Sequence, residues 1–413
     1  MPEEFYRIKR LPPYVFAEVN RLKAEFRAEG RDIIDFGMGN PDQDTPAHIV
    51  DKLVETVRRP RTHRYSASKG VAGLRRAQAR YYERRFGVTL NPDTEVIATL
   101  GSKEGLANLA MAITAPGDVI LSPNPSYPIH PYGFIIAGGA LRHIPALGPD
   151  GRFDPDAYLA ALERAIHHSV PSPVAIIVNF PSNPTAQVCD RDFYRRLVAL
   201  ARAHGVWVLS DLAYAEVYFD IDPPPSILEV EGARECAGEF TSLSKTYSMP
   251  GWRMGFAVGN ERLIAALARI KSYLDYGAFT PVQVAAAHAL DGPQDCIDEV
   301  RALYRGRRDV LVEAFRRAGW AIPAPPATMF AWAPVPRPFA DLGSMAFSKI
   351  LLAEAGVAVS PGVGFGEHGE GFVRLGLVEN EQRIRQAARG VRALMADPAA
   401  AIERHFGGRA AAE

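Results

Sequence analysis

The chain has 413 residues, of which 47% are hydrophobic and 23% are charged. This length suffices for two to four domains or one large α/β enzyme core, and the apolar fraction excludes a disordered protein. Lys plus Arg and Asp plus Glu number 47 each, a balance that argues against a nucleic-acid-binding protein. Three widely spaced cysteines exclude a disulfide scaffold and give no zinc-ligand pattern. The N-terminal residues lack a signal-peptide pattern and no apolar stretch approaches the roughly 20 residues that span a bilayer, so we expect no membrane contact and a cytoplasmic location.

The first 45 residues predict one amphipathic helix flanked by loops, which starts at Pro12-Pro13 and ends at Gly30, and then a short strand within 32–46. Helices and strands alternate from there on. Helical patterns cover 46–59, 71–86, 103–115, 126–138, 154–169, 190–204 and 260–290, and strand patterns cover 96–100, 119–123, 141–146, 174–180, 206–211, 240–245 and 254–259. These strands are apolar on both faces, which is typical of parallel strands covered by helices. The sequence therefore predicts a three-layer α/β domain with a mostly parallel sheet.

The pattern changes near residue 291, where a long helix over 296–319 begins a small α+β unit of strand, helix, strand, strand and helix. The predicted organisation is an N-terminal arm and part of the small domain at 1–45, a large domain at 46–290, and the rest of the small domain at 291–413.

The segment SLSKTYSMPGWRMGF places Lys245 just past a short apolar strand. A lysine in a hydroxyl-rich pocket can lose its charge and attack carbonyl groups. The neighbouring Ser242, Ser244 and Arg253 could bind phosphate through hydroxyl and guanidinium donors. Taken alone, the segment fits a surface loop equally well. It also contains the Ser-x-x-Lys motif of penicillin-binding enzymes, but the partner motifs Ser-Asp-Asn and Lys-Thr-Gly do not occur.

Asp211 ends the apolar run VWVLSD, and Tyr214 follows three residues later. Ligands of open α/β sheets bind at the carboxyl ends of strands, where a carboxylate can hold a buried cation. The alternative, in which Asp211 caps a following helix, is favoured about two to one for this residue alone. Asn183 follows another apolar strand, and its side chain either shapes a turn or donates to a ligand oxygen.

Two glycine-containing segments partly resemble nucleotide-binding motifs, but neither matches one. LGSKEGL (100–106) combines a strand end with a helix start near Ser102, whose backbone N–H groups could bind an anion, but its spacing excludes a Walker A motif. SPGVGFGEHGEG (360–371) precedes a strand instead of a helix, so it does not match the dinucleotide fingerprint, and we expect a mobile loop.

Four successive strand ends thus carry polar groups, namely Ser102, Asn183, Asp211 and Lys245. Pyridoxal phosphate (PLP) is bound by three such groups: donors for its phosphate, a nucleophilic lysine for its aldehyde, and a carboxylate for its ring cation. We expect this cofactor and no metal.

With these motifs in order, the chain resembles the class I aminotransferases of the aspartate-aminotransferase fold over essentially its whole length. SLSKTYSMPGWRMGF is similar to that family's cofactor-lysine segment. The segments RLPPYVF, SPNPSYPIH, SYLDYGAFTPVQVAA and VSPGVGFGEHGEGFVRLGLVEN most resemble the bacterial alanine-synthesising glutamate–pyruvate aminotransferases. The resemblance implies the PLP-dependent transferase fold type I and a homodimer with shared active sites.

The resemblance also implies roles for individual residues. Lys245 would form the Schiff base with the cofactor and then transfer the proton, and Asp211 would pair with the pyridinium nitrogen. The other residues implied to hold the cofactor are Ser102, Lys103 (mainly through its backbone), Ser242, Ser244 and Arg253 at the phosphate, Tyr127 stacked on the ring, Tyr214 and Asn183 at the phenolic oxygen, and Tyr65 at the phosphate of the neighbouring subunit. The residues implied to bind substrate are Arg374 at the α-carboxylate, Gly39 and Asn40 from the N-terminal loop, Asn183, and Tyr14. One departure is Ala186, where many relatives have Gly.

The expected reaction moves an amino group between small amino acids and 2-oxo acids, with glutamate and pyruvate as the first choice. The sequence offers no obvious second arginine for the side-chain carboxylate of glutamate, so Tyr14 or water would bind it. Alternatives are a diaminopimelate, methionine or broad-specificity aminotransferase, a PLP β-lyase, and a PLP-fold regulator without turnover. The zero net charge disfavours the regulator, because such proteins carry a fused DNA-binding segment.

Overall fold

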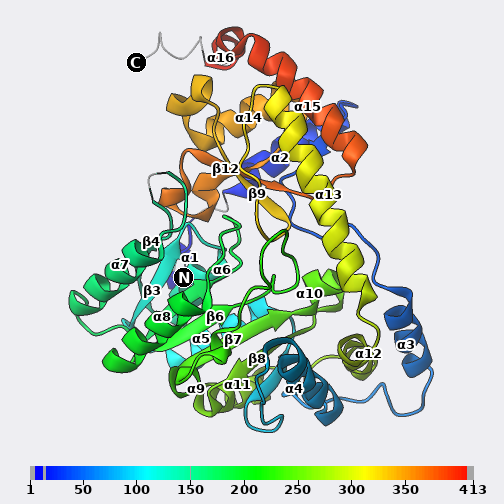
Figure 1. Cartoon of the computed structure of the whole chain (residues 1–413), viewed down its shortest axis with the longest axis vertical. Coiled ribbons are helices and arrows are strands. Elements are labelled where there is room, and N and C mark those ends of the chain that lie inside the picture. The colour runs from blue at the N-terminus through cyan, green and yellow to red at the C-terminus, as the bar shows by residue number, and fades with distance from the viewer. Residues whose placement is uncertain (1–4, 13–14, 149, 407–413) are drawn as a thin grey trace.

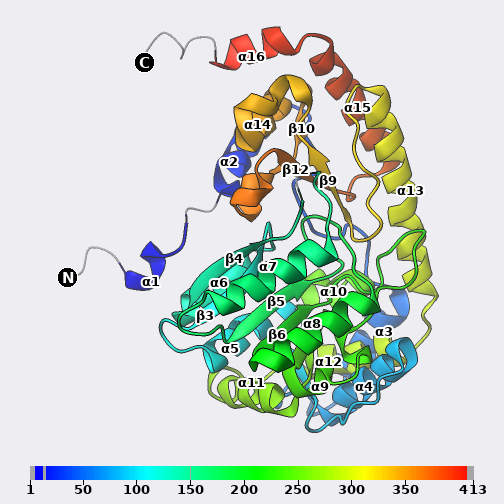
Figure 2. The same ribbon diagram turned by 60° about the vertical axis from the view of Figure 1, so that its left-hand side comes forward.

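A computed structural model describes residues 5–12, 15–148 and 150–406. Figures 1 and 2 show a larger unit built on one sheet and a smaller unit above it, with helix α13 (Asp295–Arg317) running along both. Tyr14, which was predicted to bind substrate, lies outside the described residues. Among the helices of the described ranges, none is both long enough and apolar enough to cross a membrane.

The larger unit contains a seven-stranded sheet in the order β2-β8-β7-β6-β5-β3-β4. Its strands are β2 (Val96–Thr99), β3 (Val119–Asn124), β4 (Ala140–Pro145), β5 (Ala175–Asn179), β6 (Trp207–Asp211), β7 (Ala237–Ser242) and β8 (Gly255–Gly259). Only β8 runs antiparallel to its neighbours, β2 and β7. The prediction of a mostly parallel sheet is confirmed.

Helices cover both faces of this sheet. One face packs against α5 (Ser102–Ile113), α6 (Ile129–Ala137) and α11 (Glu261–Leu274). The core on the other face includes α4 (Ala72–Phe86), α7 (Pro155–His167), α8 (Arg191–His204) and α12 (Thr280–Asp291), and α3 (Ala47–Val57) packs against α12. In β5, Ile177 belongs to the first core while Ile176 and Val178 belong to the second, so the strand is apolar on both faces because both faces are buried.

The smaller unit combines segments from both ends of the chain. Strand β1 (Ile34–Asp35) pairs with β10 (Val357–Ala358), and an antiparallel sheet has the order β11-β12-β9. The remaining elements here are α2 (Phe16–Ala28), β9 (Phe330–Pro334), α14 (Gly343–Ala355), β11 (Ser360–Pro361), β12 (Phe372–Gly376), α15 (Glu381–Ala396) and α16 (Pro398–Phe406). A short helix, α1 (Tyr6–Lys9), precedes α2 and was not predicted. The domain boundaries at residues 45 and 290 stay a prediction.

Two predicted elements were wrong in part. The single helix predicted over 260–290 is two helices, because the chain turns at Asp275, whose Oδ1 accepts a hydrogen bond from Gly277 N at 2.6 Å. The strand predicted over 240–245 ends at Ser242, and Lys245 lies in the helical turn α10 (Leu243–Thr246). The Ser242 hydroxyl starts this turn by accepting from Ser244 N at 3.1 Å.

Candidate active site

A cavity of about 560 Å³ lies at the ends of β2, β5, β6 and β7, and its wall also includes residues of the smaller unit. Because these strands run in the same direction, their carboxyl ends share one edge of the sheet. The cavity wall contains nearly every predicted site residue, namely Gly39, Asn40, Ser102, Lys103, Tyr127, Asn183, Asp211, Tyr214, Ser242, Ser244, Lys245, Arg253 and Arg374.

The Lys245 side chain is largely buried and extends toward the N-terminal loop, where Nζ donates to Gly39 O at 3.0 Å. The pKa of Lys245 is lowered from 10.5 to about 8, mainly by burial and then by the positive charges of the nearby Arg374 and Arg253 guanidinium groups. An amine with this pKa is partly neutral near pH 7.5, which is the form that reacts with an aldehyde.

Asp211 is buried at the end of β6, and its Oδ2 lies 2.9 Å from Nε2 of the fully buried His130 on α6. Its Oδ1 accepts from Ala213 N at 3.3 Å. The alternative that Asp211 caps a helix is excluded, because residues 212–217 form turns and no helix. The carboxylate instead faces the cavity with one oxygen fixed by His130.

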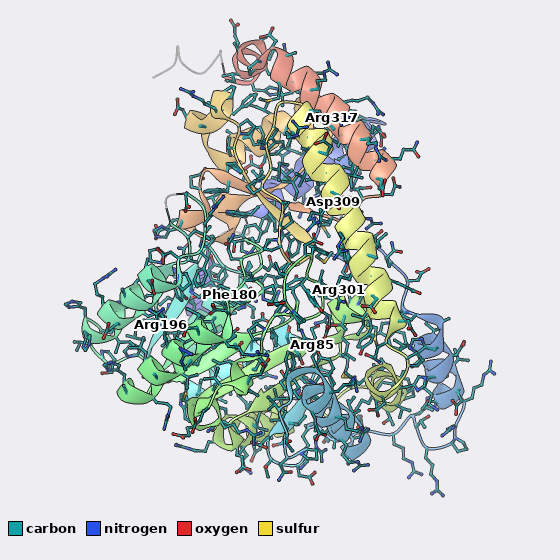
Figure 3. All side chains as sticks on the ribbon, viewed as in Figure 1. Arg85, Phe180, Arg196, Arg301, Asp309 and Arg317 are labelled. Atoms are coloured by element: carbon teal, nitrogen blue, oxygen red, sulfur yellow. The ribbon has the colours of Figure 1, made fainter. Side chains whose placement is uncertain are left out.

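The loop after Asp211 is held by helices of both units. Glu216 Oε1 accepts from Tyr81 OH at 2.7 Å and from Arg85 Nε at 3.1 Å, while Oε2 lies 3.5 Å from the Arg301 guanidinium on α13. Figure 3 labels both arginines. These contacts fix the segment that carries Tyr214, whose burial raises its pKa well above the usual value.

Two asparagines connect the end of β5 to the cavity. Asn179 donates to Asp211 O at 2.7 Å, and its side-chain oxygen accepts from Asn183 N at 2.8 Å. The Asn183 side-chain oxygen in turn accepts from Arg374 at 2.9 Å. Asn183 therefore links Asn179, through its backbone N–H, to the Arg374 guanidinium on β12, through its side-chain oxygen.

Arg374 is buried and held in place by planar neighbours. Its Cζ lies 4.2 Å from the centroid of the Phe330 ring and 4.7 Å from that of Phe365. A second nitrogen donates to Gly37 O at 3.3 Å. A guanidinium held by two aromatic rings and by hydrogen bonds presents a fixed fork, which suits bidentate binding of a carboxylate.

The end of the cavity away from Arg374 carries several groups that can bind an anion. Gly101 precedes α5 with a φ of +87°, and a Cβ there would lie 2.3 Å from the Arg253 guanidinium. This guanidinium donates to Leu100 O at 3.1 Å and to Pro250 O at 2.9 Å. The first-turn N–H groups of α5 and the Ser242 and Ser244 hydroxyls lie at the same end, so several donors converge there.

Tyr127 and Lys103 form part of the wall between these ends. The centroid of the Tyr127 ring lies 5.9 Å from that of the His130 ring, and the two ring planes meet at 81°. Lys103 Nζ lies 5.8 Å from the centroid of the Tyr127 ring. Tyr65 does not line this cavity; it is 87% exposed and its ring lies 4.7 Å from that of Tyr276.

Sequence reasoning missed several residues that shape the site. Asn179 is the last residue of an apolar strand and carries the same signal that singled out Asp211. His130 lies one helical turn after Tyr127, a weak signal. Phe330 and Phe365 gave none, because an aromatic residue in an apolar segment is indistinguishable from core before the fold is known.

The residues present fit pyridoxal phosphate. The cavity wall carries the cations Lys103, Lys245, Arg253 and Arg374, and among its described residues Asp211 is the only carboxylate. This excess of positive charge matches a phosphate and a substrate carboxylate, and the absence of a Cβ at Gly101 leaves room for the Arg253 guanidinium at the anion-binding end. A buried carboxylate, a partly neutral lysine and an anion cradle in one cavity define a PLP-dependent enzyme of fold type I.

Comparison with known proteins narrows this class. Residues 31–391 match the aminotransferase class I and II family, and the chain belongs to that family. It is 66% identical over 390 residues to AatC of Rhizobium meliloti (strain 1021), covering 94% of this chain and 95% of that protein, whose name indicates an aminotransferase without stating a substrate. It is 52% identical over 391 residues to the glutamate-pyruvate aminotransferase AlaC of Escherichia coli (strain K12), covering 94% and 93%. The substrate-bound structure of BacF from Bacillus subtilis has a TM-score of 0.88 at 34% identity, covering 95% and 98%.

Proposed function

We propose that this aminotransferase uses glutamate and pyruvate and yields 2-oxoglutarate and alanine. The observation that carries the proposal is the cavity whose wall contains Lys245, Asp211 and Arg374 together with the anion-binding end at Gly101, Ser242 and Arg253. The 52% identity to a glutamate-pyruvate aminotransferase supports the choice of substrates.

In the proposed mechanism, Lys245 would hold the cofactor and, as a neutral amine, would take the α-proton of the substrate. When bound, PLP supplies an electron sink for the electron pair that the α-proton leaves behind. The lowered pKa of Lys245 keeps part of the amine neutral and therefore able to accept a proton. The Asp211 carboxylate, whose orientation is fixed by His130, would keep the ring nitrogen of the cofactor protonated by opposite-charge pairing.

The remaining proposed roles concern orientation. Tyr214 and Asn183 would donate to the phenolic oxygen of the cofactor, and Tyr127 would pack on its ring. Arg374 binds the substrate α-carboxylate, so the guanidinium decides which bond at the α-carbon faces Lys245. The proposed phosphate ligands are Ser102, Lys103, Ser242, Ser244 and Arg253, and Gly39 and Asn40 complete the substrate side.

The charge distribution of the cavity supports a small substrate. Its arginines, in the part of the chain that the structure describes, are Arg253 at the anion-binding end and Arg374 at the carboxylate site. The remaining cation, Lys103, is exposed and lies against the Tyr127 ring. Alanine would therefore leave no buried cation without a partner, whereas an arginine dedicated to a side-chain carboxylate would be left unpaired.

We also propose a homodimer in which Tyr65 reaches the phosphate site of the partner subunit. Tyr65, Tyr273, Leu274, Tyr276 and Phe279 are each between 44% and 87% exposed. Ser68 Oγ donates to Asp275 O at 2.7 Å, which holds the two segments together in one exposed apolar patch. Patches of this kind mark protein–protein contacts. The cytoplasmic location stays a prediction.

The substrate proposal is tested by half-reaction rates with a panel of amino acids, followed as loss of the visible absorbance of the PLP form. We expect alanine and glutamate to react efficiently, and lysine and aromatic amino acids to react poorly. A strong preference for diaminopimelate, methionine or an aromatic donor over both alanine and glutamate would overturn the substrate pair and leave the aminotransferase assignment intact.

A further inference from the structure

The glycine-rich segment 360–371 of the smaller unit lies on the segment that follows β3 in the larger unit. It folds as two 3₁₀ turns, Gly362–Phe365 and Glu367–Gly369. Ser126 N donates to Phe365 O at 2.8 Å, and His368 N donates to the Asn124 side-chain oxygen at 3.2 Å. Asn124 is the last residue of β3 and is only 2% exposed, so these hydrogen bonds lie in a buried contact between the units.

Gly366 is the residue that lets this contact form. Its φ is +126°, and a Cβ built there would lie 2.2 Å from the Asn124 side-chain oxygen. The Asn124 amide therefore occupies the space that any other residue at 366 would fill. We call this arrangement the Asn124–Gly366 contact.

The Asn124–Gly366 contact fixes a ring of the proposed carboxylate site. Phe365 directly precedes Gly366, and its ring centroid lies 4.7 Å from Arg374 Cζ, on the guanidinium that Phe330 also contacts. The Phe365 ring also contacts the rings of Phe16 and Trp332, with centroid distances of 5.2 Å and 6.0 Å. Phe365 is thus held by its backbone against the larger unit and by its side chain against Arg374.

We propose that Asn124 and Gly366 are positioning residues for substrate binding, because their contact keeps the Phe365 ring on the Arg374 guanidinium. This inference rests on the role proposed above for Arg374. If the contact is lost, Phe365 is free to leave the guanidinium, which then gains rotational freedom and exposure to water. Both changes weaken its hold on the α-carboxylate, which all amino acid substrates share. The weakening should therefore be the same for alanine and for glutamate.

The test compares Asn124→Ala, Gly366→Ala and the double variant as PLP-loaded enzymes. Gly371→Ala is the matched control, since Gly371 has a φ of +82° in the same segment and a Cβ there would meet nothing within 4 Å. For each variant, the apparent dissociation constants of alanine and glutamate and the saturating half-reaction rate are measured, together with PLP affinity.

We expect Asn124→Ala to raise both dissociation constants by roughly two- to tenfold, the effect of one lost hydrogen bond, with the saturating rate and PLP affinity within about twofold of the parent. Gly366→Ala should raise them more than Gly371→Ala does. It should raise them less in the Asn124→Ala background, because the clashing amide is then absent. If Gly366→Ala does not fold, the result for Asn124→Ala decides.

Two further outcomes separate this inference from the proposed function. Arg374→Lys serves as the reference and should weaken the binding of every amino acid. If Arg374→Lys weakens binding but Asn124→Ala does not, or if Asn124→Ala weakens alanine and glutamate unequally, the positioning role is wrong. If Arg374→Lys has no effect, the role proposed for Arg374 is wrong.

Discussion

In the cofactor-free enzyme, the Lys245 amine should titrate near pH 8 instead of above pH 10. Burial is the main cause of the lowered pKa, and the guanidinium groups of Arg374 and Arg253 contribute next in that order. An amine with a pKa of about 8 is about one quarter neutral at pH 7.5, compared with about one molecule in a thousand for a pKa of 10.5. The site therefore holds more than a hundredfold excess of reactive amine over an ordinary lysine at that pH.

The assay is competitive labelling of the cofactor-free enzyme with trace acetic anhydride between pH 6 and 11. N-acetyl-lysine amide in the same tube serves as the reference amine, and mass spectrometry gives the yield at Lys245. We expect the yield at Lys245 to level off about two to three pH units below that of the reference. Arg374→Gln should raise the Lys245 midpoint more than Arg253→Gln does, because Arg374 contributes the larger repulsion.

A Lys245 midpoint that coincides with that of the reference amine would refute this reasoning. A midpoint that stays near 8 but does not respond to either arginine substitution would leave burial as the only cause.

Three further predictions follow from other buried groups. Asp211→Asn should fold normally but lose roughly ten- to thousandfold in turnover, since one opposite charge shifts a pKa by one to three units; near-parental turnover would refute its electronic role. Burial raises the pKa of Glu239 from 4.5 to about 7. Between pH 4.5 and pH 7 the folded protein therefore keeps a proton on Glu239 that the unfolded chain has already released. The free energy of unfolding consequently falls as the pH rises from 4.5 to 7. Urea unfolding gives the free energy of unfolding at pH 4.5 and at pH 8. The difference between the two should be about 3 kcal/mol smaller in Glu239→Gln than in the parent, and an equal difference in both proteins would contradict the prediction. Mixing inactive Lys245→Ala with Tyr65→Ala subunits should restore up to about a quarter of the parental sites if Tyr65 acts across a dimer, and none if each chain builds its own site.

The strand-end residues of the site could be predicted from the sequence for a physical reason. A strand buried on both faces excludes polar side chains, so a polar residue directly after such a run must lie at the sheet edge. Asp211 and Asn183 were found in this way. Parallel strand direction then brings these ends together, as the cavity wall shows.

The rest of the site depends on contacts between residues far apart in the chain, which leave no local pattern. His130 lies 81 residues from Asp211, and Asn124 lies 244 residues from its partner His368. The glycine-rich segment 360–371 was expected to be a mobile loop, because its partner on β3 cannot be found from its own sequence. The strand predicted over 240–245 was too long for a different, local reason: the Ser242 hydroxyl accepts from Ser244 N and starts a helical turn, which the apolar pattern of the segment does not reveal.

Binding of PLP through Lys245, in the cavity at the sheet edge, can be measured by borohydride reduction of the PLP-loaded enzyme followed by peptide mass spectrometry. The neighbouring Lys103 serves as the internal comparison. We expect a single labelled peptide with the cofactor on Lys245, and no label in the Lys245→Ala variant. Label on Lys103 or on any other lysine of the parental enzyme would contradict it.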